Sequence, residues 1–152
     1  CLNIDKRTEP SIQERNITSF IRTAKVNFGL AVEEGLFRVK ADGTIENFKY
    51  NAKDPHSLSS NFVRACCEDN LGNIWIGTFN GLNRYNKITG LFQNHTANDT
   101  QADGLTHSSI WCIVKDNQGT LWLGTYFGGV NYFNPEYEIY TRYSYSSNEK
   151  KG

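Results

Sequence analysis

Residues 68–86 read E-D-N-L-G-N-I-W-I-G-T-F-N-G-L-N-R-Y-N, and residues 115–134 repeat the pattern as K-D-N-Q-G-T-L-W-L-G-T-Y-F-G-G-V-N-Y-F-N. The first half of the pattern recurs after about 47 residues, as from Trp75 to Trp122, and one residue is then inserted. A period of roughly 40–50 residues, built from short apolar runs and glycine turns, is typical of a β-propeller blade. The sequence therefore predicts an all-β fold of four-stranded antiparallel blades. Function is then expected in the loops, because a propeller is a scaffold for many activities.

The repeat predicts a partial propeller of about three blades. Two clear copies are expected at 62–95 and 110–143, and a degenerate copy at 17–50 lacks the tryptophan and the Asp-x-x-Gly turn. The other segments are predicted to be a preceding blade's tail and linker at 1–16, linkers at 51–61 and 96–109, and a linker to a further blade at 144–152. On this interpretation Cys1 is a mid-chain residue. The alternative is the lipidated first residue of a mature lipoprotein.

Composition narrows the function classes. The chain has 152 residues, and its 16 basic and 16 acidic residues cancel without forming a basic stripe, so a nucleic-acid partner is not expected. No apolar run reaches the ~18 residues of a membrane span, and no signal peptide is visible. The four cysteines have no C-x-x-C spacing, so neither a metal site nor a cofactor is predicted. Cys66, Cys67 and Cys112 are expected to pack in the strands as small hydrophobes.

The residues shared by the two copies are predicted to be structural. The aspartates and the following glycines form turns: Asp69, Gly72, Asp116 and Gly119. The tryptophans are expected to fill the wedge between blades, and the glycines near them allow close approach: Trp75, Gly77, Trp122 and Gly124. The alternatives are a ligand platform for the tryptophans and metal binding for the aspartates.

The candidate binding surface follows from propeller topology. Loops that lead into each inner strand, and turns between second and third strands, emerge on one face around the channel. Binding residues concentrate in loops held by a rigid scaffold. The candidate ligand-binding residues on this face are Asn80, His107, Tyr126 and Phe127. No nucleophile elbow, phosphate loop or His-Glu-x-x-His motif occurs, so no catalytic residue is predicted.

The string D-N-x-G-x-[IL]-W-[IL]-G-T, followed by G-L-N-R-Y-N, resembles the two-component regulator propeller repeat. The preceding S-L-S-S-N and G-L-T-H-S elements resemble the linker of that family. The resemblance implies the periplasmic sensor region of a hybrid two-component protein of Bacteroides-like bacteria, joined in the parent chain to a membrane helix and a histidine kinase. It also implies glycan-derived or other periplasmic ligands. The fragment itself carries no kinase motif and is not expected to be an enzyme.

Two other functions stay open on the sequence. One is a propeller enzyme of the streptogramin-lyase or lactonase type, which needs His or carboxylate clusters around the channel. The other is a pure protein-interaction scaffold. In addition, blades at the ends of an open arc expose apolar faces, so self-association through the terminal blades is expected.

Overall fold

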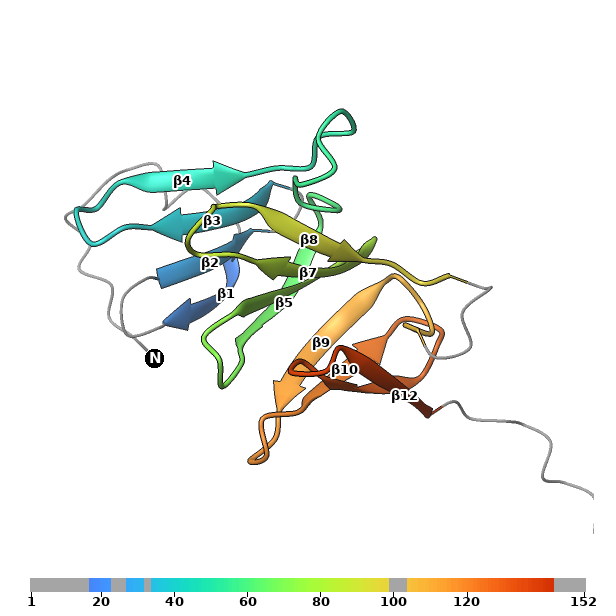
Figure 1. Ribbon diagram of the computed structural model, residues 1–152. Coiled ribbons are helices and arrows are strands. Elements are labelled where there is room, and N and C mark those ends of the chain that lie inside the picture. The colour runs from blue at the N-terminus through green and yellow to red at the C-terminus, as the bar shows by residue number, and fades with distance from the viewer. Residues whose placement is uncertain (1–16, 23–26, 32–33, 99–103, 144–152) are drawn as a thin grey trace, which may run out of the picture.

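The computed structural model describes residues 17–22, 27–31, 34–98 and 104–143, with side chains from residue 34 onward. These residues form antiparallel strands and no helix, as Figure 1 shows. The prediction of an all-β partial propeller with about three four-stranded blades is confirmed.

The three sheets follow one another along the chain, and each places its four strands in sequence order. The first sheet contains β1 (Ile17–Arg22), β2 (Asn27–Ala31), β3 (Gly35–Val39) and β4 (Ile45–Phe48). The second contains β5 (Val63–Glu68), β6 (Ile74–Thr78), β7 (Gly81–Tyr85) and β8 (Phe92–His95). The third contains β9 (Ile110–Lys115), β10 (Leu121–Thr125), β11 (Val130–Asn134) and β12 (Ile139–Tyr143).

The predicted segments at both ends fall outside this description. The expected blade tail at 1–16, which includes Cys1, and the expected linker at 144–152 lie outside the described residues. The blade boundaries proposed from the repeat stay predictions in those segments.

Apolar side chains between the sheets hold the arc together. Strand β5 contacts β1 on one side and β9 on the other, so the first strand of each sheet lies innermost. One core between the first and second sheets is built from Leu36, Leu58, Val63, Ile74, Ile76, Tyr85 and Phe92. A second core between the second and third sheets is built from Trp75, Leu82, Leu105, Ile110, Leu121, Leu123 and Phe133.

A buried asparagine in the third strand of the second and third sheets forms hydrogen bonds with the linker that precedes that sheet. The Asn83 side chain accepts a hydrogen bond from the Ser59 amide (2.8 Å) and donates to the Ser59 hydroxyl (2.9 Å). In the next repeat, Asn131 accepts from the Thr106 amide (3.0 Å) and donates to its hydroxyl (2.7 Å). Both asparagines are fully buried, so these bonds satisfy polar groups that water cannot reach. The linkers are thereby held as part of the scaffold.

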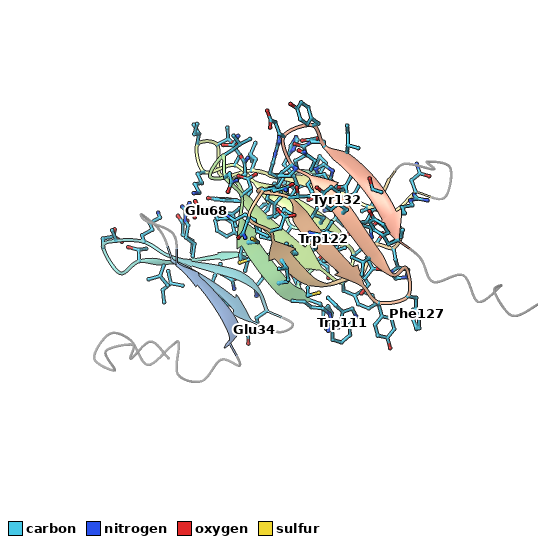
Figure 2. All side chains as sticks on the ribbon, turned by 90° about the horizontal axis from the view of Figure 1, so that it is seen from below. Glu34, Glu68, Trp111, Trp122, Phe127 and Tyr132 are labelled. Carbon is cyan, nitrogen blue, oxygen red and sulfur yellow. The ribbon has the colours of Figure 1, made fainter. Side chains whose placement is uncertain are left out.

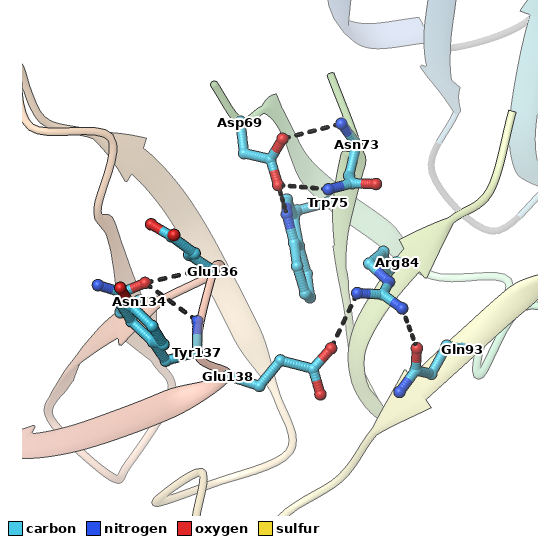
Figure 3. A network of polar contacts seen from close by, with 9 residues as sticks. All are labelled: Asp69, Asn73, Trp75, Arg84, Gln93, Asn134, Glu136, Tyr137 and Glu138. Atoms are coloured by element: carbon cyan, nitrogen blue, oxygen red, sulfur yellow. Dashed lines mark hydrogen bonds and ion pairs between the residues drawn. The ribbon is translucent and has the colours of Figure 1, made fainter. Parts of the chain in front are cut away.

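The aspartate that recurs in the first turn of both repeats also binds the tryptophan of the second strand (Figure 3). The Asp69 carboxylate accepts bonds from the amides of Leu71 (2.9 Å) and Asn73 (2.8 Å) and from the indole N–H of Trp75 (2.8 Å). Asp116 accepts equivalent bonds in the third sheet, including one from the Trp122 indole at 3.1 Å. One carboxylate thus closes the turn and satisfies the ring that follows it.

The expectation that both tryptophans are core residues is wrong for Trp122. Trp75 is fully buried, and its ring packs edge to face against the ring of Phe133 in the third sheet, with 4.8 Å between the ring centres. Trp122 is only half-buried, and its neighbours are Tyr132 and Tyr143 of its own sheet. The physical reason is that the third sheet covers the face of the second, whereas no described residues form a sheet over the third.

The cysteines and glycines also depart in part from expectation. Cys66 and Cys67 are half-buried, but Cys112 is exposed because it lies on the same uncovered face as Trp122. A side chain at Gly77 would lie 2.6 Å from the Ile110 side chain of the next sheet, so this glycine does permit close approach. A side chain at Gly124 would instead meet the Cys112 sulfur of its own sheet at 2.5 Å.

Candidate ligand-binding face

Backbone hydrogen bonds bring linkers and turns together at one end of the sheets. The Phe79 amide donates to the Phe62 carbonyl (3.0 Å), and the Tyr126 amide donates to the Ser109 carbonyl (3.0 Å). Each bond joins the turn after a second strand to the residue that leads into the first strand of the same sheet. We call the surface formed by these linkers and turns the loop face.

Three of the four predicted residues lie together on the loop face of the third sheet. The His107 ring is 6.2 Å from the Phe127 ring, and the Tyr126 and Phe127 rings meet edge to face at 4.1 Å. Phe127 is 80% exposed and Tyr126 is 52% exposed, so these rings offer most of their surface to solvent. Apolar rings that face water in a group are typical of a binding surface.

Sequence reasoning missed Trp111. This residue of β9 is 46% exposed, and its indole stacks on Tyr126 with ring centres 5.5 Å apart. Figure 2 shows Trp111 and Phe127 beside each other at the same edge of the molecule. The available signal was a tryptophan at the position that holds Arg64 in the preceding copy, outside the repeated motif. We call His107, Trp111, Tyr126 and Phe127 the aromatic cluster.

A cation completes the aromatic cluster from the second sheet. The Arg64 guanidinium of β5 lies 4.0 Å from the centre of the Trp111 ring, within the range of a cation–π interaction. The contact crosses from one inner strand to the next. It therefore fixes the indole at the junction of two blades.

Asn80 is not joined to the aromatic cluster by any contact found among the described residues. It is exposed in the β6–β7 turn, where its amide donates to the Thr78 hydroxyl at 3.1 Å. The ring of its neighbour Phe79 lies beside the ring of Phe62, with 6.2 Å between the ring centres. The second sheet thus has a pair of aromatic rings where the third sheet has the aromatic cluster. The four predicted residues thus occupy two neighbouring positions on the loop face.

The described residues contain no group of three or more His, Cys, Asp or Glu side chains arranged to hold a metal ion. The part of the chain that the structure describes also has no helix with the length and apolar character needed to cross a membrane. The chemistry that the aromatic cluster offers is apolar ring surface and an imidazole, with the Arg64 guanidinium beside it.

The model of the two component regulator propeller matches residues 57–80 and 104–127. Each of these two segments matches one two-component regulator propeller repeat. The resemblance inferred from the repeated string is therefore confirmed, and both matches include the end of a linker, the strand that carries the tryptophan and the turn on the loop face. Curated protein sequences gave no significant match to the chain.

Solved structures share the fold of these propeller repeats. The extracellular domain of a protein assigned to the hybrid two-component systems of B. thetaiotaomicron has a TM-score of 0.71 at 19% identity, covering 84% of this chain and 18% of that one. A second such extracellular domain from the same organism has a TM-score of 0.50, also at 19% identity, covering 84% of this chain and 25% of that one. Virginiamycin B lyase from Staphylococcus aureus has a TM-score of 0.62 at 14% identity, covering 86% of this chain and 42% of that one.

Because each of these structures is less than 20% identical to this chain, the similarity shows a shared fold only. The chain spans about a fifth of the length of the first of these extracellular domains and less than half of the lyase. The two-component regulator propeller repeats therefore correspond to one part of a larger architecture in each of these relatives.

Proposed function

We propose that these repeats are a segment of the extracytoplasmic, ligand-sensing propeller of a hybrid two-component sensor, and that the loop face binds glycan-derived oligosaccharides. The observation that carries the proposal is the exposed aromatic cluster, displayed by repeats of the two component regulator type. In this role the segment binds a ligand without transforming it. The parent protein transmits the signal to a cytoplasmic histidine kinase.

The chemistry of the aromatic cluster supports a sugar ligand. Sugar rings have apolar faces of C–H groups, which pack on exposed indole and phenyl rings, and a rim of hydroxyls that needs hydrogen bonds. Trp111 and Tyr126 are stacked nearly parallel, with 20° between their planes, and Phe127 stands nearly perpendicular to Tyr126. This arrangement offers two differently oriented apolar surfaces. In this proposal His107 supplies a polar contact beside them, and Asn80 supplies a further one from the neighbouring sheet.

The proposed location and signalling role rest on the relatives. Two structures with this fold are extracellular domains of proteins assigned to hybrid two-component systems. By that analogy the propeller faces the periplasm, where glycan breakdown products arrive. The ligand class, the location and the link to a kinase are all parts of the proposal.

Binding by the loop face can be tested with matched aromatic variants. Phe127→Ala and Trp111→Ala are expected to weaken oligosaccharide binding by about fivefold or more, since stacked aromatic contacts contribute ~1 kcal/mol. Tyr137→Ala is the control, because Tyr137 is also exposed (66%) but lies in the turn between the third and fourth strands, at the other end of the sheet. Calorimetric titration against a panel of oligosaccharides is the measurement.

The result also separates the two other functions. Turnover of the streptogramin quinupristin, with which one lyase relative was crystallised, would favour an enzyme. Equal effects of Phe127→Ala and Tyr137→Ala on oligosaccharide binding would contradict the loop-face site. Retention of a protein partner that is released only by the loop-face variants would favour an interaction scaffold.

A further inference from the structure

The first strand of each sheet has one irregularity at the end that adjoins the loop face. Strand register leaves one extra residue, a β-bulge, at residue 18 in β1, at Arg64 in β5 and at Trp111 in β9. In the second and third sheets this residue closely follows Phe62 or Ser109, whose carbonyl binds the loop-face turn. Bulges are common beside functional sites, because they turn a side chain away from the regular alternation of a strand.

The identity of the bulge residue is not explained by the repeat. The residue before the bulge is a buried aliphatic one in both of these sheets, Val63 and Ile110, and each belongs to a core between two sheets. The bulge itself holds arginine in one sheet and tryptophan in the other, and neither side chain is fully buried. Core packing therefore accounts for the position before the bulge, and the bulge residue is left for another role.

Arg64 differs from the other three arginines whose side chains the structure describes. Arg38 and Arg84 each pair with a glutamate, and Arg142 donates to a backbone carbonyl of the linker. Arg64 has no hydrogen bond or ion pair with a described residue, and its guanidinium lies over the Trp111 ring. A guanidinium has five N–H donors and stays charged, so this group lacks an acceptor.

The two terminal nitrogens of Arg64 are the atoms that a ligand can reach. Nε is inaccessible to solvent, so it takes no part in such a site. The terminal nitrogens are not among the inaccessible unpaired atoms, and the residue as a whole is half-buried. Two N–H groups on the edge of a planar guanidinium match the two oxygens of a carboxylate. The Trp111 ring, 4.0 Å away, limits the freedom of the guanidinium.

The aromatic cluster places apolar surface beside this cation. Trp111 stacks on Tyr126, and Tyr126 meets Phe127 edge to face, so the rings continue outward from the arginine. A ligand that follows this series of contacts meets a cation first and exposed rings next. A uronic acid unit combines a carboxylate with a ring that has apolar C–H groups. A neutral sugar would displace water from the guanidinium without supplying an anion.

We propose that the ligand of the loop face is an acidic oligosaccharide, and that Arg64 binds the carboxylate of one of its uronic acid units. Tyr126 and Phe127 contact the sugar rings, and Trp111 positions the guanidinium. The inference rests on the proposed function, because it names the class of glycan that the loop face selects. It also gives the bulge of β5 a role in the choice of ligand.

Matched acid and ester forms of the same oligosaccharide test the carboxylate. The probes are short fragments of polygalacturonate, polymannuronate and hyaluronan, each as the free acid and as the methyl ester. At least one acid is expected to bind, and its ester about tenfold more weakly or worse, because the ester loses a charged hydrogen-bonded pair. Added salt is expected to weaken binding of the acid and to change that of the ester little. Calorimetric titration is the measurement.

Variants of the arginine test the residue. Arg64→Gln removes the charge, so acid and ester are expected to bind it within about twofold of each other. Arg64→Lys keeps the charge without the paired N–H groups, so it is expected to retain part of the preference for the acid. Arg84→Gln is the matched control and is expected to keep the full preference, because Arg84 pairs with Glu138 in a turn at the other end of the sheets.

The outcomes separate this inference from the proposed function. Equal affinity of the wild type for acid and ester, or a preference that Arg64→Gln leaves intact, would overturn the assignment. Tighter binding of a sulfated fragment without carboxylates would also overturn it. If neutral oligosaccharides bind and Phe127→Ala weakens them, the loop-face site stands without a role for Arg64. If neither acidic nor neutral oligosaccharides bind, both proposals are wrong.

Discussion

Trp75 and Trp122 occupy equivalent positions in two repeats, but their surroundings differ. Trp75 is covered by the third sheet, whereas Trp122 keeps one face open. Trp75→Ala is therefore expected to lower the free energy of unfolding by ~3–5 kcal/mol, and Trp122→Ala by clearly less, because the cost follows the packing that is lost. Urea unfolding of both variants measures the difference. Equal losses would show that Trp122 is as well packed as Trp75 in solution.

His95 makes stability depend on pH. Burial lowers the pKa of His95, the nearby Glu138 opposes this effect, and Arg84 adds to it. Because the folded protein binds the proton more weakly than the unfolded chain, stability is expected to fall as pH drops below the unfolded pKa of ~6.5. Unfolding midpoints measured from neutral to mildly acidic pH test this dependence.

The variant His95→Phe should lose this part of the pH dependence, and His56→Gln should retain it. Phenylalanine has no proton to bind, and it occupies the equivalent position at the other interface as Phe48. If both variants follow the wild-type curve, another group controls stability in this range.

At the scale of the elements, the turn between β11 and β12 has an unusual residue. Glu138 has a φ of 54°, and Gly43 and Gly90 hold the corresponding left-handed positions in the other two sheets. The Glu138 carboxylate pairs with Arg84 of the neighbouring sheet at 2.9 Å, as Figure 3 shows. A surface pair of this kind contributes ~1 kcal/mol at most, so it offsets backbone strain of similar size.

Two neutral variants separate the strain from the ion pair. Glu138→Asn and Glu138→Gln both remove the charge, but asparagine tolerates a left-handed backbone better. The asparagine variant is therefore expected to be more stable than the glutamine variant by about 1 kcal/mol. Equal urea midpoints for the two would mean that the turn relaxes and stores no strain.

The strands were predictable because their signals are local. Apolar alternation and glycine turns recur in each repeat, so the sequence was sufficient to predict four strands per blade. The bond from Asp69 to the Trp75 indole was not predicted, because the two residues meet only after the hairpin has formed. The deep burial of Leu58 in the linker was likewise missed, since it depends on the packing of two sheets.

The candidate site was predicted in part for the same reason. Topology placed His107, Tyr126 and Phe127 in loops at one end, and the structure joins their rings. It does not bring Asn80 into the aromatic cluster, because that residue belongs to the neighbouring sheet. Trp111 was overlooked because its exposure on an inner strand depends on how the blades are arranged, which no single repeat encodes. The binding role of all these residues stays a prediction.

At the scale of the whole molecule, the outer face of the third sheet is apolar and uncovered. Strand register places six large apolar or aromatic side chains on this face: Val114, Trp122, Val130, Tyr132, Ile139 and Tyr143. Four of them are exposed large hydrophobic residues with more than a third of their surface accessible. Such a surface is expected to drive association of the 152-residue chain with further copies of itself.

Sedimentation over a range of concentrations tests this expectation. Val114→Lys should reduce association, because it places a charge on the apolar face. Ile88→Lys is the control, since Ile88 is 96% exposed but lies in a turn of the second sheet. A wild-type protein that stays monomeric at every concentration would contradict self-association.

The distribution of bonds within and between repeats has a consequence for how such arrays evolve. The bonds of Asp69 to Trp75 and of Ser59 to Asn83 join residues of a single linker-plus-blade unit. The aromatic contacts of His95 with Phe133 instead cross from one unit to the next. When a unit is duplicated, its internal polar bonds are therefore duplicated with it, and a new interface forms between the copy and its neighbour. The residues at each interface can then diverge independently, so selection can alter one interface without unfolding the units on either side.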